Sequence, residues 1–380
     1  MFIVDSNLRC NFENRPEGPC TYCYNTSPRR NFRDGKVTDI KVLEDTLRKE
    51  FPKKQGGIIL HGGEPLYMEE KILKKLLKLS FELSGRSNIQ TNGSLISDKK
   101  IKLFKKYKTH IGVSVDGYWP ANKWRGKTKK NTDLVINNIL KLKKAGVATA
   151  VLMTIHKNNV APEKIKYIEK LILDFSKEGI PSKVNLIYHP DSKIEISPEQ
   201  AKSAYLRLAN FVVDNNLSNI RPFQSIVNAL LGKRSECTFQ DCDPFCTHAT
   251  HVTAGGVPNL CGRFDNEIFY QGDFPVCPSF RWNLLSQTDC KGCRYGGKVC
   301  FGGCPAVARD WDWRNKDRFC EAYYVLFEFF EKKLKALLPF VPLKTEPNFK
   351  PSFPEKQRPI NVSDRRPLQG SSHKNESIKK

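Results

Sequence analysis

The chain has 380 residues, 39% of them hydrophobic, which is enough for one large folded domain and a smaller one. Lys and Arg number 63 against 40 Asp and Glu, a formal net charge of +23 that favours an acidic partner such as nucleic acid, a membrane surface or an acidic peptide. No apolar run reaches the roughly 18 residues that span a bilayer, and the N-terminal sequence does not read as a signal peptide. We therefore expect a cytoplasmic protein without a membrane segment.

Short apolar runs alternate with amphipathic helical runs over the first two-thirds of the chain. The predicted strands are Phe2–Val4, Gly57–Leu60, Asn88–Thr91, Ile111–Val115, Ala148–Thr154 and Val184–Tyr188. The predicted helices are Asp39–Phe51, Glu69–Leu83, Asp98–Tyr107, Thr132–Ala145, Pro162–Glu178 and Pro198–Asn215. Ser97 and Ser197 are expected to cap two of these helices.

This β-α alternation predicts an α/β fold with a mostly parallel sheet. Six such units suggest a partial (β/α)6 barrel of the TIM type over residues 1–232, with the site at the carboxyl ends of the strands. A small Cys-rich domain is expected over 233–325 and a closing helix over 326–340. Residues 341–380, rich in Pro, Lys, Arg, Ser and Asn, predict a disordered tail.

The chain contains 13 cysteines, and ten of them lie between Cys237 and Cys320. A disulfide framework is not expected in a cytoplasmic chain of this size. Cysteines grouped at short spacings fit metal or cluster ligation better. The Cys-rich domain is therefore expected to be held together by metal rather than by a large apolar core.

Cys10, Cys20 and Cys23 follow the first predicted strand, with gaps of nine and two residues. Three cysteines on one loop can bind three irons of a [4Fe–4S] cluster and leave the fourth iron open to another ligand. The same three cysteines would also suit an incomplete zinc site.

Polar and glycine residues follow the next three strands. The second strand runs into Gly62, Gly63 and Glu64, the third ends at Gln90 to Asn92, and the fourth ends at Ser114. Each segment alone reads as an ordinary turn. Their occurrence in this order, after a cysteine loop, indicates a ligand site at one edge of the sheet.

Together these segments resemble the radical S-adenosylmethionine (SAM) enzymes, although that family usually has three residues in the first cysteine gap. The resemblance implies that Glu64 accepts a hydrogen bond from the SAM ammonium, that Gly62 and Gly63 let backbone approach its methionyl end, and that Ser114 contacts its ribose or carboxylate. It also implies SAM contacts from four further residues and, more weakly, an adenine contact from the strand that ends at Met153 to Ile155. Those four are Tyr24, Gln90, Asn92 and Arg125.

The later cysteines resemble the SPASM domain, a C-terminal extension of radical SAM peptide maturases with two auxiliary clusters. The resemblance implies that one cluster uses Cys290, Cys293, Cys300 and Cys320, and the other uses Cys242, Cys246, Cys261 and Cys304. Cys237 is an alternative to Cys242, and Cys277 is left without an assigned partner. Paired short cysteine spacings also describe zinc ribbons.

The resemblance implies SAM and three [4Fe–4S] clusters as cofactors, a flavodoxin or ferredoxin as electron donor, and hydrogen abstraction from a ribosomally made precursor peptide. The product would be a crosslink, an epimer or a backbone excision, such as removal of a tyramine unit. The positive charge fits an acidic leader peptide, and the early first strand suggests a separate leader-binding protein. No catalytic base can be nominated. The alternatives are an anaerobic sulfatase maturase that forms formylglycine and a zinc-dependent nucleic-acid-binding protein.

Overall fold

The computed structural model describes residues 2–23, 39–51, 57–187, 189, 193–233, 235–236, 238–239, 251–256, 258–259 and 278–337. All of them belong to one compact unit, Met1–Asn348. The predicted tail over 341–380 lies outside the described residues. None of the helices in the described part is long and apolar enough to cross a membrane.

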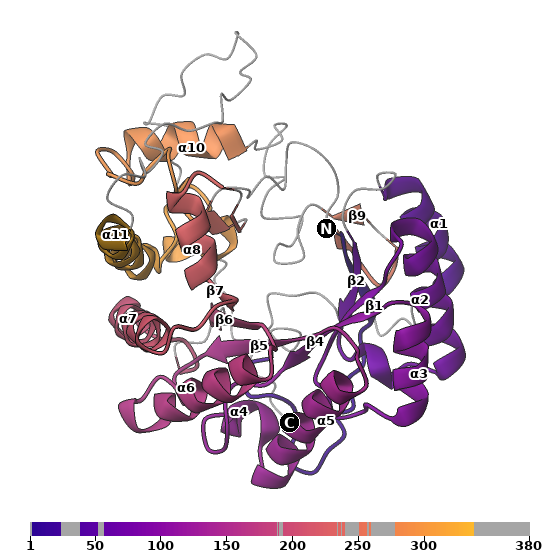
Figure 1. The fold of residues 1–380 in the computed structure, drawn as a ribbon. Coiled ribbons are helices and arrows are strands. Elements are labelled where there is room, and N and C mark those ends of the chain that lie inside the picture. Colours follow the sequence, from indigo (N-terminus) through magenta and orange to yellow (C-terminus); the bar gives the residue numbers. More distant parts are fainter. Residues whose placement is uncertain are drawn as a thin grey trace, which may run out of the picture. The chain divides into compact units, whose positions relative to one another are not determined.

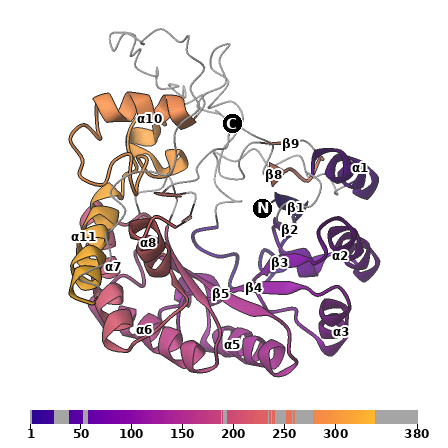
Figure 2. The same ribbon diagram turned by 45° about the horizontal axis from the view of Figure 1, so that its top comes forward.

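A twisted sheet of mainly parallel strands forms the centre of this unit (Figures 1 and 2). Its strands are β1 (Phe2–Asn7), β2 (Ile58–Gly62), β3 (Asn88–Thr91), β4 (His110–Ser114), β5 (Thr149–Ile155), β6 (Ser182–Leu186), β7 (Ile220–Arg221), β8 (His251–Val252) and β9 (Pro258–Asn259). The order is β7-β6-β5-β4-β3-β2-β1-β8-β9, and only the β8–β9 pair is antiparallel among the described strands. The sheet does not close, which confirms the predicted partial barrel.

Helices cover the outer face of the sheet (Figure 1). They are α1 (Ile40–Glu50), α2 (Glu70–Ser84), α3 (Asp98–Lys106), α4 (Lys123–Gly126), α5 (Lys129–Lys144), α6 (Pro162–Lys177) and α7 (Pro198–Asp214). Ser97 accepts a hydrogen bond from the backbone of α3, and Ser197 forms a capping box with Gln200 at the start of α7. Both predicted caps are confirmed.

The two faces of the sheet differ in chemistry because side chains alternate along each strand. Val4, Leu60 and Val113 are at most 1% exposed and belong to the core under the helices. The opposite, inner face carries polar or small residues at neighbouring register positions. They include Asp5, His61, Gln90, Gly112, Ser114, Thr154 and Asn185.

Helix α8 (Phe223–Leu230) follows β7, and the Cys-rich part contributes α10 (Pro278–Gln287), α11 (Cys320–Leu337) and short turns of helix at Pro305–Val307 and Arg309–Trp311. A further short turn of helix, Pro65–Tyr67, follows β2 in the barrel. Helix α11 packs against α7 and α8, so the end of the chain's described part lies against the last units of the barrel. Arg318 and Glu195 form an ion pair between the Cys-rich part and the loop that precedes α7.

Several elements differ from the sequence prediction in their bounds. Helix α5 begins at Lys129, three residues before the predicted Thr132, because Thr128 caps it through Asn131. Helix α11 begins at Cys320, six residues before the predicted closing helix over 326–340. Strands β7 and β8 have two residues each and were not predicted. The predicted boundary at residue 232 remains a prediction.

Candidate active site at the carboxyl edge of the partial barrel

The first cysteine loop leaves the carboxyl end of β1 and is held by backbone hydrogen bonds. The Glu13 amide donates to the Cys10 carbonyl at 3.1 Å, and the Cys23 amide donates to the Cys20 carbonyl at 3.1 Å. The Thr21 amide donates to the Trp124 carbonyl at 2.9 Å. The loop is therefore shaped as two turns that carry the cysteines, with a fixed contact to the segment after β4.

The structure brings the three thiols of this loop near one another. Burial raises the pKa of Cys10 to about 12 and of Cys20 to about 11, and neighbouring thiols add to both shifts. Thiols in such surroundings stay protonated unless a metal compensates the thiolate charge. A cluster spreads its ligands over several irons, so three cysteines on one loop fit a cluster.

Gly62 and Gly63 pack directly against the start of the cysteine loop. A Cβ atom on Gly62 would lie 2.2 Å from the Asn7 carbonyl oxygen, and one on Gly63 would lie 2.4 Å from that of Arg9. The Gly63 and Glu64 amides donate to these same two carbonyls at 2.5 and 2.9 Å. Because Gly62 and Gly63 have no side chain, the backbone of the cysteine loop can approach this turn closely. An approach of SAM to them remains a prediction.

The Glu64 carboxylate is buried, at 1% exposure, and is largely occupied by the protein itself. One oxygen, Oε1, accepts from the Thr91 hydroxyl at 2.6 Å and the Leu66 amide at 2.9 Å, and Oε2 accepts from the Asn92 amide at 2.7 Å. Burial raises its pKa, and these hydrogen bonds offset part of that shift. Glu64 therefore fixes the turn after β3, and Oε2 is the atom with acceptor capacity left for a ligand.

The polar residues at the ends of β3 and β4 differ in how they are held. The side-chain nitrogen Nδ2 of Asn92 donates to Oδ1 of Asn11 at 2.9 Å and contacts the Cys10 sulfur at 3.8 Å, which connects β3 to the cysteine loop. Gln90 and Ser114 are half-buried on the inner face, and neither side chain hydrogen-bonds to any residue in the described ranges. These two side chains are therefore available to a ligand.

Arg125 does not point at an open space but forms a buried ion pair. Its Nε donates to Asp116 Oδ2 at 3.2 Å, and Asp116 is fully buried. Burial acts to raise the pKa of Asp116, but Arg125 and His156 outweigh it and hold the pKa at about 2. The Arg125 carbonyl also accepts from Arg15 at 2.6 Å. The predicted SAM contact from Arg125 remains a prediction, and the observed role is to anchor the cysteine loop.

Asp116 joins three parts of the site. It accepts a hydrogen bond from Tyr22, which lies between Cys20 and Cys23, and one from the Thr154 amide on β5 at 2.9 Å. The His156 ring lies between Tyr22 and Trp124, with ring centres 4.8 Å from each. The end of β5, where an adenine contact was predicted, is thus connected to the cysteine loop through the Asp116 carboxylate.

The structure also brings together the four cysteines predicted for one auxiliary cluster. Burial raises the pKa of Cys300 to about 12 and of Cys290 to about 11, and each of these thiols is influenced by Cys320. Cys293 likewise acts to raise the pKa of Cys290 and that of Cys320. Aromatic residues of α11 line the adjoining cavity of about 300 Å³, which includes Cys293, Cys300 and Cys320. Four mutually close thiols fit a fully ligated cluster.

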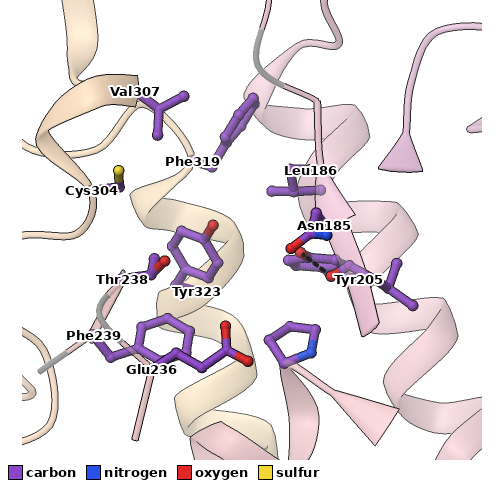
Figure 3. Close-up of a pocket in the computed structure, with 12 residues that line it drawn as sticks. Asn185, Leu186, Tyr205, Glu236, Thr238, Phe239, Cys304, Val307, Phe319 and Tyr323 are labelled. Carbon is purple, nitrogen blue, oxygen red and sulfur yellow. Dashed lines mark hydrogen bonds between the residues drawn. The ribbon is translucent and has the colours of Figure 1, made fainter. Parts of the chain in front are cut away.

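Cys304 lies in a different cavity, of about 460 Å³, between β6 and α11 (Figure 3). Figure 3 shows Cys304 and Val307 facing Asn185 and Leu186 across this cavity, with Tyr323 between them. Cys304 is buried, and it lines this cavity rather than the one beside Cys293, Cys300 and Cys320. This position agrees with its assignment to a separate cluster, which stays a prediction because Cys242, Cys246 and Cys261 lie outside the described residues. Tyr24, Cys237 and Cys277 also lie outside them.

One polar group on the inner face was missed by the sequence analysis. Asp5 of β1 is 1% exposed and lies between two histidines, His251 of β8 and His61 of β2. The signal in the sequence was a charged residue within an otherwise apolar strand. Asp116, two residues after the predicted strand end at Ser114, is the second missed residue.

Comparisons with known proteins agree with this geometry. The Radical SAM superfamily matches residues 8–172. The cysteine-type anaerobic sulfatase-maturating enzyme of Clostridium novyi (strain NT) is 22% identical over 380 residues, covering 89% of this chain and 96% of that protein. In the solved structure of anSMEcpe with bound AdoMet and Cp18Cys peptide, the fold matches with a TM-score of 0.67 and 20% identity, covering 88% of this chain and 97% of that one. Streptococcus suis SuiB bound to precursor peptide SuiA matches with a TM-score of 0.54 and 16% identity, covering 84% and 75%.

The similar solved structures share the fold of this chain, and the match to the Radical SAM superfamily identifies the domain over residues 8–172. It covers β1 with its cysteine loop, the Gly62–Glu64 turn and the strand ends at Gln90 and Ser114. A zinc site at Cys10, Cys20 and Cys23, and with it the zinc-dependent nucleic-acid-binding alternative, is not supported by this match. Residues 8–172 of this chain are a radical SAM domain, which implies a SAM site with a [4Fe–4S] cluster.

Proposed function

We propose that the chain is a radical SAM maturase that abstracts a hydrogen atom from a residue of a peptide or protein. The observation that carries this proposal is the presence of two separate thiol sets in one compact unit. Cys10, Cys20 and Cys23 follow β1 at the edge of the barrel, and the set of four surrounds the start of α11. One incomplete and one complete ligand set suit one reactive and one electron-transfer cluster.

The chain's own residues would bind and orient the cofactors. Cys10, Cys20 and Cys23 would hold the reactive cluster, and Ser114, Gln90 and Glu64 Oε2 would bind the polar groups of SAM. With SAM bound, such a cluster supplies a carbon-centred radical that removes a hydrogen atom from the substrate. The Asp116 hub, defined as Asp116 with Tyr22, Arg125 and His156, would keep the cysteine loop in register with β5. We further propose three clusters in all, with Cys304 serving the third.

The relatives support a peptide or protein as the substrate. The sulfatase-maturating enzyme of Clostridium novyi is matched along nearly its whole length, and anSMEcpe and SuiB were solved with peptides bound. Near-complete coverage favours the second candidate of the sequence analysis, oxidation of a cysteine to formylglycine. Maturation of a ribosomally made precursor peptide is the alternative within the same class, and for it a separate leader-binding protein and a flavodoxin or ferredoxin donor remain proposals.

The test uses anaerobically purified holoenzyme with SAM and dithionite. Two probe peptides, Cp18Cys and SuiA, are added separately, and 5′-deoxyadenosine and peptide mass are measured. We expect deoxyadenosine above the peptide-free level and a changed mass in one peptide. The changed mass distinguishes formylglycine from a crosslink or an excision.

A triple variant provides the control. Replacing Cys10, Cys20 and Cys23 by Ala should abolish deoxyadenosine formation while iron bound by the later cysteines remains. Deoxyadenosine formation by this variant, or a colourless wild-type protein with stoichiometric zinc, would contradict the proposal.

A further inference from the structure

A carboxylate and two imidazoles form a group on the inner face of the barrel that the site described above does not use. Nε2 of His251 lies 3.0 Å from Oδ2 of Asp5, and Nδ1 of His61 lies 3.6 Å from Oδ1 of the same carboxylate. Asp5 and His251 are almost fully buried, whereas the His61 side chain is 22% exposed. We call these three residues the inner triad.

The strand register explains why the three side chains meet. Asp5 is the direct neighbour of His61 across the β1–β2 pair, and His251 pairs with Ile3 across β1–β8. Side chains on one face of adjacent strands lie close enough to contact. Ser6 also donates to the His61 carbonyl at 3.0 Å, which fixes the end of β2. His61 immediately precedes the Gly62–Glu64 turn, whose backbone donates hydrogen bonds to the start of the cysteine loop.

Packing alone does not account for this group. A buried carboxylate is costly unless it is paired, and replacing buried ion pairs by apolar residues of similar volume is often neutral or stabilising. An apolar residue at position 5 would continue the run that starts at Phe2. A purely structural alternative is that Asp5 fastens β8 to β1 through His251, but that contact needs no second imidazole on the exposed side of the carboxylate.

Three other histidines in the described part of the barrel lack this combination of features, and one of them, His189 after β6, is buried at 7% exposure. His156 is fully buried between the rings of Tyr22 and Trp124. His110 is exposed but stands at the amino end of β4, away from the cysteine loop. His61 combines a carboxylate behind its Nδ1 with partial exposure at the carboxyl edge.

We propose that His61 is a catalytic residue that accepts a proton from the substrate, with Asp5 and His251 as positioning residues. The inference rests on the proposed function. After a hydrogen atom has left a carbon that bears an –SH or –OH group, one electron and one proton must still leave to form the C=S or C=O bond. The electron would be accepted by an oxidised iron–sulfur cluster that Cys290, Cys293, Cys300 and Cys320 would hold, and the proton would be accepted by His61 Nε2. A carboxylate behind Nδ1 orients the ring and stabilises the imidazolium that forms.

The 3.6 Å separation between His61 and Asp5 is longer than a hydrogen bond. Catalytic contacts are often long in the absence of substrate and shorten when it binds. A small rotation of the partly exposed His61 ring would close this distance, while Asp5 stays held by His251.

The experiment separates proton acceptance from hydrogen abstraction. Holoenzyme is given SAM, dithionite and the Cp18Cys probe peptide with deuterium on its cysteine β-carbon, and two rates are measured: deuterium transfer to deoxyadenosine and formation of oxidised peptide. For H61Q we expect deuterium transfer within about twofold of wild type and product lowered at least about 100-fold, as for loss of a general base. D5N should show the same uncoupling in weaker form. H110Q, a matched histidine substitution on the same sheet, should change neither rate.

A parallel fall of deuterium transfer and product in H61Q, or no change in either, would overturn the inference. If H61Q does not retain iron, H61A with added imidazole decides: recovery of product by about tenfold or more supports the inference, and no recovery overturns it. Protection of His61 from diethyl pyrocarbonate by the peptide gives a readout that needs no turnover, and equal labelling with and without peptide counts against it. Absence of deuterium transfer from Cp18Cys in wild type, together with no deoxyadenosine above the peptide-free level with SuiA, refutes the proposed function instead.

Discussion

The ion pair beneath the first cysteine loop allows a direct test of how the site is held. Asp116 is fully buried and is contacted by Arg125, Tyr22 and His156, so D116N keeps the side-chain volume but removes the charge. Arg125, only 16% exposed, would then be left as a buried cation without its partner. Breaking a buried pair from one side costs about 3–5 kcal/mol.

The expected loss can be measured as a shift in melting temperature. With an unfolding entropy of roughly 2 cal/mol/K per residue, 3–5 kcal/mol lowers the melting temperature of a chain of this size by roughly 4–7 °C. The matched control is D174N. Asp174 likewise accepts from a tyrosine, Tyr118, at 2.8 Å and pairs with Lys170 at 2.8 Å, but its side chain is 31% exposed. Its replacement should cost less than about 1 kcal/mol.

Both variants are compared with wild type by anaerobic differential scanning fluorimetry and by iron content. D116N should also lose iron from the proposed first cluster, because Tyr22, which donates to Asp116, lies between the proposed ligands Cys20 and Cys23. Equal melting temperatures for D116N and D174N would refute the argument that burial of the Arg125 charge determines the cost. Full iron content in a destabilised D116N would refute the connection to the cysteine loop.

Three further outcomes follow from the contacts of the site. G63A should lower SAM cleavage at least about tenfold, measured as deoxyadenosine, because backbone lies 2.4 Å from the added Cβ; G255A, whose nearest atom is 3.9 Å away, should be unaffected. R281Q should lower the melting temperature by roughly 4 °C, because the buried Arg281 guanidinium donates to four backbone carbonyls near the set of four cysteines. R309Q should change the melting temperature little, because the ion pair of Arg309 with Asp289 is half-exposed. Removal of iron by an anaerobic chelator should make residues 278–337 more sensitive to protease than residues 57–187, as followed by mass spectrometry of the fragments.

Much of the barrel could be predicted because its signals are local. Strand β3 has the predicted bounds, Asn88–Thr91, and α7 begins at the predicted cap because Ser197 and Gln200 satisfy each other within one turn. Strands β7 and β8 carry no such signal. Each has two residues and exists through pairing with a neighbour, β6 or β1, far away in the chain.

The sequence predicted where the candidate site residues lie, but not which groups they contact. Glu64 lies where a SAM ligand was expected, yet three hydrogen bonds from the protein occupy most of its carboxylate. Arg125 lies near the cysteine loop, yet its charge is paired with Asp116. Motif spacing places a side chain at the edge of the sheet, whereas its hydrogen bonds depend on which other segments approach, and that is a tertiary property.

The inner triad shows what a local reading can and cannot recover. Asp5 and His251 are 246 residues apart, so no window of sequence contains the pair. A weaker sign was present, since β1 begins with three apolar residues and then places Asp5 and Ser6 where a buried strand would continue to be apolar. A charged residue there must either weaken the strand or meet a partner from elsewhere. Because the strand forms and Asp5 is buried, the partner had to exist, and the remaining question was whether it serves packing or chemistry. The ratio of product to deuterium transfer in H61Q and D5N answers that question, because a role in packing would lower both rates together.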